Sequence, residues 1–258
     1  MRLHIEDIKK NFGEKEVLKG CSGIFEQGRI YGLLGRNGAG KTTLLKAIYG
    51  DFEDFSGSAK IEEDDGTVRE LSGDEIGMIF SQPMIPDFLT GYEFIKFYSE
   101  AIGKEVDIEA LFDRLNFDEK DGHRLIKGYS SGMKSKLHLM TLLISKPPVM
   151  LLDEPLTSLD VVVAEEIKNI LLGFKEEHII IFSTHIMQLA KDMCDEIVLL
   201  KDGILETIEG LDKASSEYER KIIEHLTAGD MPTSEASEAE TAENSVNGEE
   251  VGIDVADL

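Results

Sequence analysis

Cysteine is scarce in this 258-residue chain, which has only Cys21 and Cys194, at no spacing typical of metal ligands. So few thiols argue against a disulfide framework and favour a reducing compartment. Long apolar runs are missing too. None approaches the 18 residues of a membrane span, and residues 1–7 lack the apolar stretch of a signal peptide. We therefore expect that a role at a membrane would need a separate partner chain.

Basic residues are also few, with 27 Lys and Arg against 51 Asp and Glu and a net charge of −24. Nine of the acids lie in residues 230–258, which contain no Lys or Arg, so 42 acids remain in the rest of the chain. Such a field repels nucleic-acid phosphates, and without a local basic patch we expect no nucleic-acid partner. Residues 227–258 are rich in Ser, Thr, Glu and Ala, which predicts a disordered acidic tail.

Residues 35–43 read Gly-Arg-Asn-Gly-Ala-Gly-Lys-Thr-Thr and form a complete G-x-x-x-x-G-K-[ST] phosphate loop. Its glycines let backbone N–H groups curl around nucleotide phosphates, Lys41 reaches the β- and γ-phosphates, and the Thr42 hydroxyl binds Mg²⁺. The flanks agree, because an apolar run precedes the loop and a helical pattern follows it. The predicted phosphate-loop contacts are Gly35, Asn37, Gly38, Ala39, Gly40, Lys41, Thr42 and Thr43.

The hydropathy pattern predicts an α/β fold in which the P-loop NTPase core has a mainly parallel sheet. Residues 1–34 alternate as an N-terminal antiparallel β region, and residues 51–80 read as short strands broken by acidic turns. Apolar residues at three- and four-residue spacings predict an inserted helical subdomain at about 86–145. Fully apolar runs predict central parallel strands at 149–152 and 179–182. A hairpin at 197–208 and a last helix at 211–226 complete the domain, which has no internal repeat.

Two adjacent acids, Asp153 and Glu154, follow the apolar strand at 149–152. Asp153 is placed to hold Mg²⁺ through a water molecule, and Glu154 can polarise a water for attack on a γ-phosphate. The alternative is a strand that ends in ordinary surface acids. The phosphate loop about a hundred residues upstream favours the catalytic interpretation.

The order of the motifs resembles the ATP-binding subunit of an ABC transporter, over about residues 1–226. The series comprises the phosphate loop, an isolated glutamine, an S-x-G-led helix, a Leu-Leu-Asp-Glu-Pro strand end, a Ser-Leu-Asp turn and a strand-end histidine. The resemblance implies two subunits that face head to tail, with each ATP between the phosphate loop of one and the S-x-G segment of the other. It also implies a permease that this motor would drive.

The resemblance also assigns nucleotide contacts. Phe12 matches an aromatic residue that stacks on adenine, and Val17 lies in the adjoining position. Gln82 matches a glutamine that touches Mg²⁺ and the attacking water. Ser130 and Gly132 match the signature that reaches the γ-phosphate of ATP on the opposite subunit. A turn aromatic and a surface amide are the alternatives for Phe12 and Gln82.

Two further matches follow the acidic strand end. Leu159 and Asp160 match a turn that bridges two subunits, and His185 matches a switch histidine that contacts the γ-phosphate. An ordinary turn and a structural histidine are the alternatives. The chain departs from the family at Tyr129-Ser-Ser-Gly-Met133, where Leu-Ser-Gly-Gly-Gln is common. Such S-x-G-M-K variants resemble subunits paired with separate export permeases, so we expect export.

The expected cofactors are therefore ATP and Mg²⁺, with Lys41, Gln82, Glu154 and His185 as the catalytic set and Thr42, Gln82 and Asp153 as metal contacts. The expected partners are an integral-membrane permease and a second nucleotide-binding subunit, identical or different, on the cytoplasmic face of the cell membrane. Near Gln82, the apolar residues Met84, Ile85 and Phe88 could contact the permease or belong to the core. The rival functions are an ABC-type ATPase that acts on ribosomes or nucleic acid, and a nucleotide kinase or metabolic ATPase.

Overall fold

The computed structural model describes residues 1–82, 84–157, 159–208 and 215–227. Its central sheet has the strand order β10-β9-β3-β8-β7-β6. Every neighbouring pair is parallel except β9 and β10, which form the expected hairpin. The strands are β3 (Arg29–Leu34), β6 (Ile76–Ile79), β7 (Val149–Asp153), β8 (Ile179–Thr184), β9 (Glu196–Lys201) and β10 (Ile204–Thr207). The predicted central strands β7 and β8 are buried along their whole length, as strands covered on both faces should be.

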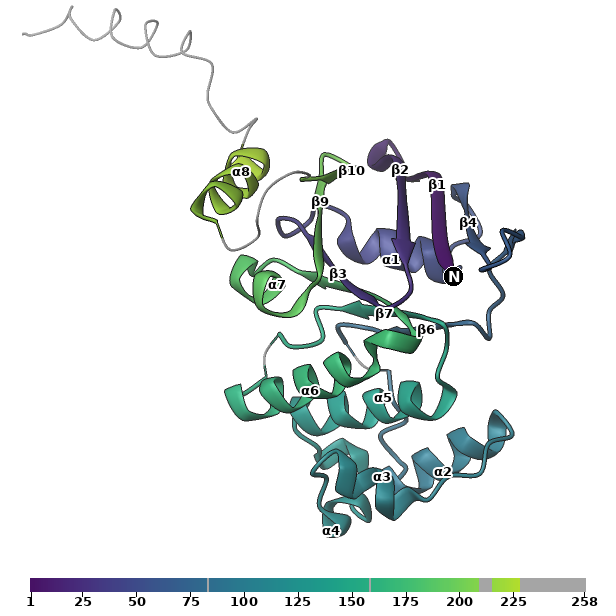
Figure 1. The fold of residues 1–258 in the computed structure, drawn as a ribbon. Coiled ribbons are helices and arrows are strands. Elements are labelled where there is room, and N and C mark those ends of the chain that lie inside the picture. The colour runs from purple at the N-terminus through teal and green to yellow at the C-terminus, as the bar shows by residue number, and fades with distance from the viewer. Residues whose placement is uncertain (83, 158, 209–214, 228–258) are drawn as a thin grey trace, which may run out of the picture.

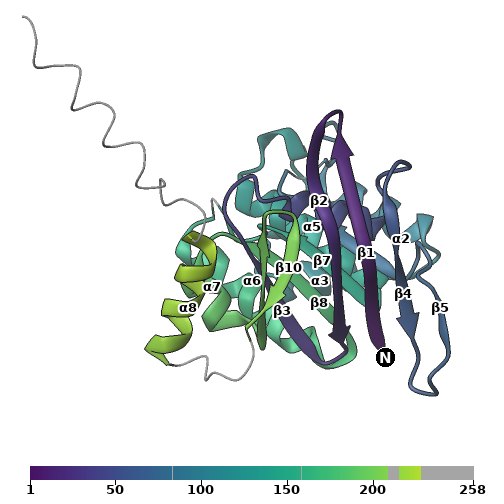
Figure 2. The same ribbon diagram turned by 90° about the horizontal axis from the view of Figure 1, so that it is seen from above.

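The second sheet is antiparallel, with the strand order β2-β1-β4-β5. It consists of β1 (Arg2–Phe12), β2 (Lys15–Glu26), β4 (Ser56–Glu62) and β5 (Val68–Glu70). This confirms the predicted N-terminal antiparallel region and the short strands after residue 51. In Figure 2 the β9–β10 hairpin lies beside β2, and Lys19 N donates to Gly203 O across 2.8 Å. The two sheets are thus joined at this edge.

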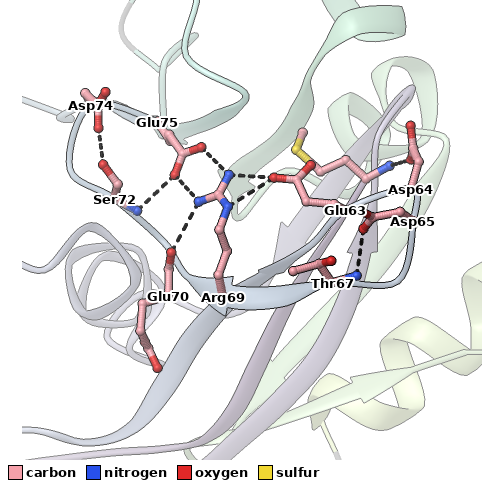
Figure 3. A network of polar contacts seen from close by, with 10 residues as sticks. Glu63, Asp64, Asp65, Thr67, Arg69, Glu70, Ser72, Asp74 and Glu75 are labelled. Atoms are coloured by element: carbon pink, nitrogen blue, oxygen red, sulfur yellow. Dashed lines mark hydrogen bonds and ion pairs between the residues drawn. The ribbon is translucent and has the colours of Figure 1, made fainter.

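Arg69 holds the other edge of the antiparallel sheet in place (Figure 3). Its guanidinium lies 2.6 Å from Glu63 Oε1 and 2.5 Å from Glu75 Oε1. Hydrogen bonding from Arg69 is the largest cause that lowers the pKa of Glu75. Because Glu75 immediately precedes β6, this network connects the edge strand β5 to the central sheet.

The helix α1 (Lys41–Tyr49) lies between the two sheets and divides its contacts between them. Side chains of the central sheet alternate between two hydrophobic cores. For example, Val149 and Leu151 face α1 and the antiparallel sheet, whereas Met150 and Leu152 face the opposite side. This alternation follows from the two-residue repeat of a strand.

The predicted inserted helices form a separate group on one side of the central sheet (Figure 1). They are α2 (Gly91–Ala101), α3 (Ile108–Arg114), α4 (Glu119–Gly122) and α5 (Ser131–Ser145), with a 3₁₀ turn at Ile126–Gly128. Thr90 and Glu93 form a capping box that begins α2. The long helix α5 contacts both α2 and the edge strand β6, so it connects this group to the core.

The remaining helices cover the face of the central sheet opposite α1. They are α6 (Val161–Phe174), α7 (Met187–Met193) and α8 (Ser216–Thr227), with a 3₁₀ turn at Lys175–Glu177. Lys191 of α7 pairs with Glu219 of α8, which lie side by side in Figures 1 and 2. The last helix was expected at 211–226. Residues 211–214 lie outside the described residues, as does the acidic tail from residue 228 on. Within the described ranges no helix is long and apolar enough to cross a bilayer.

Candidate functional site

The phosphate loop connects the end of β3 to the start of α1, as its sequence predicted. Gly40 caps α1 in the left-handed region, at φ +102°. A Cβ atom there would lie 3.1 Å from Val17 Cγ1, so any other residue would be both strained and crowded. The loop therefore presents the N-terminus of α1, where backbone N–H groups and the helix dipole favour a phosphate.

Lys41 is held inside this loop. Its side chain is 5% exposed, and Nζ donates to Gly35 O at 2.8 Å and to Arg36 O at 3.2 Å. Glu154 Oε1 lies 3.6 Å from the same nitrogen. Burial lowers the pKa of Lys41, and the charge of Glu154 partly opposes this effect. The ammonium group is thus positioned by carbonyls and a carboxylate where a nucleotide phosphate would enter.

Asp153 sits at the carboxyl end of β7 and is 1% exposed. Its Oδ2 accepts a hydrogen bond from Thr42 Oγ1 at 2.8 Å, and its Oδ1 accepts one from Ser183 Oγ at 2.8 Å. The structure therefore brings together Thr42 and Asp153, two of the three residues predicted to contact the metal, from motifs 111 positions apart. Carboxylate and hydroxyl oxygens are the hard donors that Mg²⁺ prefers, so this pair fits a magnesium ion.

Glu154 occupies a strained turn directly after β7, with φ +48°. Its Oε1 lies 3.1 Å from His185 Nδ1, and its Oε2 accepts from Thr157 Oγ1 at 3.2 Å. Burial raises the pKa of Glu154, but the hydrogen bond and charge of His185 and the charge of Lys41 outweigh it, so the net pKa is lowered. The carboxylate is therefore kept ionised, as a group that accepts a proton from water must be.

Gln82 and Glu154 line one cavity of about 380 Å³, together with Thr157. The first turns of α5 supply the other wall, through Ser131, Lys134 and Ser135. The predicted catalytic glutamine and glutamate therefore face the same space. Lys134 also lines this cavity and gives it a positive charge. The sequence did not identify Lys134 as a site residue.

A second cavity, of about 450 Å³, adjoins the phosphate loop. Val17, Asn37, Gly38 and Ala39 line it, as the predicted nucleotide contacts would. In the described part of the chain, Phe12 is not among its lining residues. The ring of Phe12 instead meets Phe52 edge-on at 5.8 Å.

Ser130 and Asp160 cap the helices α5 and α6. Ser130 Oγ accepts from Met133 N at 3.2 Å, and Asp160 Oδ1 accepts from Val162 N and Val163 N at 3.1 and 3.0 Å. Both residues are exposed. Leu159 is half-buried and packs on the core beside them. Gly132 is buried against Val163, which a Cβ atom would meet at 3.4 Å. Among the residues described, no hydrogen bond or ion pair joins these groups to the phosphate loop of the same chain.

Thr43 lies in the first turn of α1 and is half-buried. The sequence analysis missed Ser183, which is fully buried and also accepts a hydrogen bond from Glu154 N at 2.9 Å. The signal that could have identified it is a polar residue at the end of the apolar strand β8, two positions before His185.

The apolar residues after Gln82 divide between surface and core. Met84 is 91% exposed and Phe88 is 73% exposed, whereas Ile85 packs against the hydrophobic core. The sequence left this choice open, and the structure assigns Met84 and Phe88 to the surface.

Comparisons with known proteins agree with this geometry. The family model described as ABC transporter matches residues 18–157. An uncharacterized ABC transporter ATP-binding protein of Bacillus subtilis, YdbJ, is 31% identical over 227 residues, which cover 86% of this chain and 73% of the relative. A fluoroquinolones export ATP-binding protein of Mycobacterium tuberculosis is 33% identical over 198 residues, covering 75% of this chain and 65% of that protein. The solved ATP binding subunit of an ABC transporter superposes with a TM-score of 0.73 at 25% identity, covering 88% of this chain and all of the other.

Proposed function

Because this chain belongs to the ABC transporter family, we propose that it is the ATP-hydrolysing subunit that powers transport through a separate permease. The observation that carries the proposal is the convergence of Lys41, Glu154 and His185 beside the phosphate loop. The matching relatives include transporter subunits, which favours transport over an action on ribosomes or nucleic acid.

Hydrolysis needs a general base, and Glu154 is the residue we assign. Its carboxylate accepts a proton from water while the water oxygen attacks the γ-phosphorus, and the bond to the β,γ-bridging oxygen breaks to release ADP. The contact between His185 Nδ1 and Glu154 Oε1 orients the carboxylate. Gln82, which lines the same cavity as Glu154, would position the water.

The nucleotide itself would be held by the phosphate loop. Lys41 lies within reach of the developing charge, and the crowded, left-handed Gly40 fits a loop that wraps closely around phosphates. Thr42 and Asp153 would hold Mg²⁺, which when bound neutralises charge on the β- and γ-phosphate oxygens. The charge-assisted contacts would act in a partly dry site, where they are stronger than in water.

We assign Ser130, Gly132 and Asp160 to the site of a second subunit. The exposed positions of Ser130 and Asp160 at the starts of α5 and α6 leave them available to ATP bound on a partner chain, identical or different, with the buried Gly132 in the first turn of α5. ATP would then hold two subunits together, and hydrolysis would let them separate.

We assign the permease contact to the exposed side chains Met84 and Phe88, which follow the catalytic Gln82. Large exposed apolar side chains of this kind mark an interaction surface. Phe97 of α2 is also 63% exposed, on the inserted helices. The chain would thus work at the cytoplasmic face of the membrane, and the export relative favours an outward direction.

The test is a pull-down of the tagged full chain from detergent-solubilised membranes, with partners identified by mass spectrometry and phosphate release measured on the captured complex. We expect a multi-spanning partner in stoichiometric amount. A Met84→Glu/Phe88→Glu variant should lose that partner and keep ATP binding, because the phosphate loop is untouched. Val68→Glu is the matched control, since Val68 is 55% exposed on the antiparallel sheet. Capture of soluble partners alone would overturn the transport function.

A further inference from the structure

Three polar side chains form a closed ring between α5, α6 and the segment after α3. Lys136 Nζ lies 2.6 Å from Glu166 Oε2 and donates to Asn116 O at 3.1 Å. Asn116 Nδ2 donates to Glu166 Oε1 at 3.1 Å and closes the ring. The three residues come from parts of the sequence 20 to 50 positions apart. The ring therefore joins the inserted helices to the core.

The ion pair of the ring is partly removed from water, whereas Asn116 is exposed. The side chain of Lys136 is 10% exposed and that of Glu166 is 26% exposed. Charged side chains are rarely buried unless they are paired, and a buried ion pair contributes little net stability because desolvation offsets its attraction. Stability alone is therefore a weak reason for this pair, and a role in fixing the arrangement of the helices is the stronger explanation.

The position of the ring links it to the exposed caps Ser130 and Asp160. The first turns of α5 and α6 pack directly together, where Gly132 meets Val163. Lys136 is one turn further along α5, and Glu166 is about one turn further along α6. Figure 1 shows the two helices side by side. The ion pair thus fixes the rotation and register of one helix against the other, six residues after each cap.

Asn116 brings in the third part. It is the residue after Leu115, which caps the C-terminus of α3. Its backbone adopts φ +47°, a left-handed conformation that asparagine tolerates better than most residues. Its backbone carbonyl and its side-chain amide both belong to the ring. A rotation of the inserted helices would therefore change the contacts of Asn116 with both Lys136 and Glu166.

We propose that Lys136, Glu166 and Asn116 are positioning residues that hold Ser130 and Asp160 as one unit for the nucleotide of a second subunit. This rests on the proposed function, in which those two caps face ATP bound on the partner chain. The ring sets the geometry of the second half of the site and leaves the binding of ATP to the phosphate loop unchanged.

The experiment measures ATP-dependent association of the full chain by sedimentation, in a Glu154→Gln background that slows hydrolysis. A Lys136→Met/Glu166→Met variant removes both charges without leaving one unpaired, so we expect its Tm within about 3 °C of the parent. ATP affinity of the single subunit should stay unchanged. Association should weaken about tenfold, the order of effect found for residues that couple two sites. Lys136→Glu/Glu166→Lys, which restores the ion pair in reverse but loses both hydrogen bonds with Asn116, should recover part of it.

The matched control lies on the same helix. Glu165 and Lys168 form an exposed ion pair at 3.3 Å, and Lys168→Met/Glu165→Met should associate like the parent. If the double-methionine variant fails to fold, Glu166→Gln replaces it, because the amide keeps the contact with Asn116 and loses the ion pair. Parental association of the ring variants would overturn the inference.

Ser130→Arg in the same assay separates this inference from the proposed function. If Ser130→Arg blocks association and the ring variants do not, only the ring inference fails. If Ser130→Arg also leaves association intact, the paired-subunit arrangement itself fails.

Discussion

The phosphate-loop edge of the central sheet and the starts of α5 and α6 satisfy their polar groups in different ways. At the phosphate loop, Lys41 and Asp153 are almost wholly buried. Lys41 donates to two carbonyls of its own loop and pairs with the distant Glu154. Asp153 accepts hydrogen bonds from Thr42 and Ser183, both distant in the sequence. At the helix starts, Ser130 and Asp160 are exposed and bond to N–H groups of their own helices. One region is organised within the chain, and the other is presented outward.

This difference predicts which function each region loses when one of its side chains is replaced. A buried, internally paired group is fixed before any ligand arrives, so its loss should impair chemistry within one subunit. The loss of an exposed cap costs about 0.5–2 kcal/mol of stability, but its effect on chemistry should be limited to what a second molecule contributes.

The largest effect should come from Glu154→Gln, which removes the proposed base from the buried region. We expect phosphate release to fall about 10²- to 10⁴-fold, because that is the usual contribution of a general base. ATP binding, measured by equilibrium dialysis, should persist. Glu165→Gln, the same change at an exposed acid of α6, should leave turnover unaltered. Turnover of Glu154→Gln at the parental rate would remove Glu154 from the mechanism.

Ser130→Arg tests the outward region. An arginine side chain at the start of α5 should block the approach of a second subunit and weaken ATP-dependent association about 30-fold or more, as the loss of a central interface residue does. ATP binding by the single subunit should not change, because Ser130 has no contact with the phosphate loop within the described residues. Ser56→Arg, on the antiparallel sheet, is the control. If ATP binding fell instead, the two regions would not be separate.

Ser183→Ala should sharpen the description of the buried region. The change leaves Asp153 Oδ1 and Glu154 N without their hydroxyl partner. An unsatisfied buried group costs about 1–3 kcal/mol, so we expect a lower Tm together with a reduced kcat. Ser99→Ala is the matched control, since Ser99 is also buried but donates only to the helix carbonyl of Lys96. Equal losses in both variants would mean that Ser183 has no special role.

Ser183 also shows where sequence reasoning ends. The phosphate loop, the strand-end acids and the alternating strands are local patterns, and a two- or four-residue repeat can be read from a sequence. The contact between Asp153 and Ser183 depends on the pairing register of β7 and β8, which places these residues opposite each other. A one-residue slip would turn every side chain to the other face, and no local pattern specifies that register.

The same limit applies to the other surprises. Met84, Ile85 and Phe88 have similar hydropathy, and only the packed structure separates the two exposed residues from the buried one. The contact of Phe12 with Phe52 and the ring around Lys136 likewise join residues that are distant in the sequence. Motifs thus predicted the candidate site, whereas the supporting contacts required the fold.

The smallest effect should be a change in the pKa of Glu154 in His185→Ala. Burial raises this pKa, and the hydrogen bond from His185 is the largest effect that opposes burial. Because the folded pKa is lowered, the stabilisation from the ionised carboxylate is fully present above its ordinary value of 4.5 and is lost as the pH falls through the lowered value. Removing His185 should therefore raise the pKa and move this loss to higher pH.

A ¹³C NMR titration of the Glu154 carboxyl carbon measures the shift directly. His123→Ala is the control, since His123 stacks on Tyr92 among the inserted helices and leaves Glu154 untouched. A pKa of Glu154 that stayed the same in His185→Ala would mean that Lys41 and Thr157 keep the carboxylate ionised without His185. An increase would show that the buried region depends on partners from three separate elements, because Lys41, Glu154 and His185 follow β3, β7 and β8 in turn. Such dependence is what distinguishes this region from the self-sufficient caps of α5 and α6.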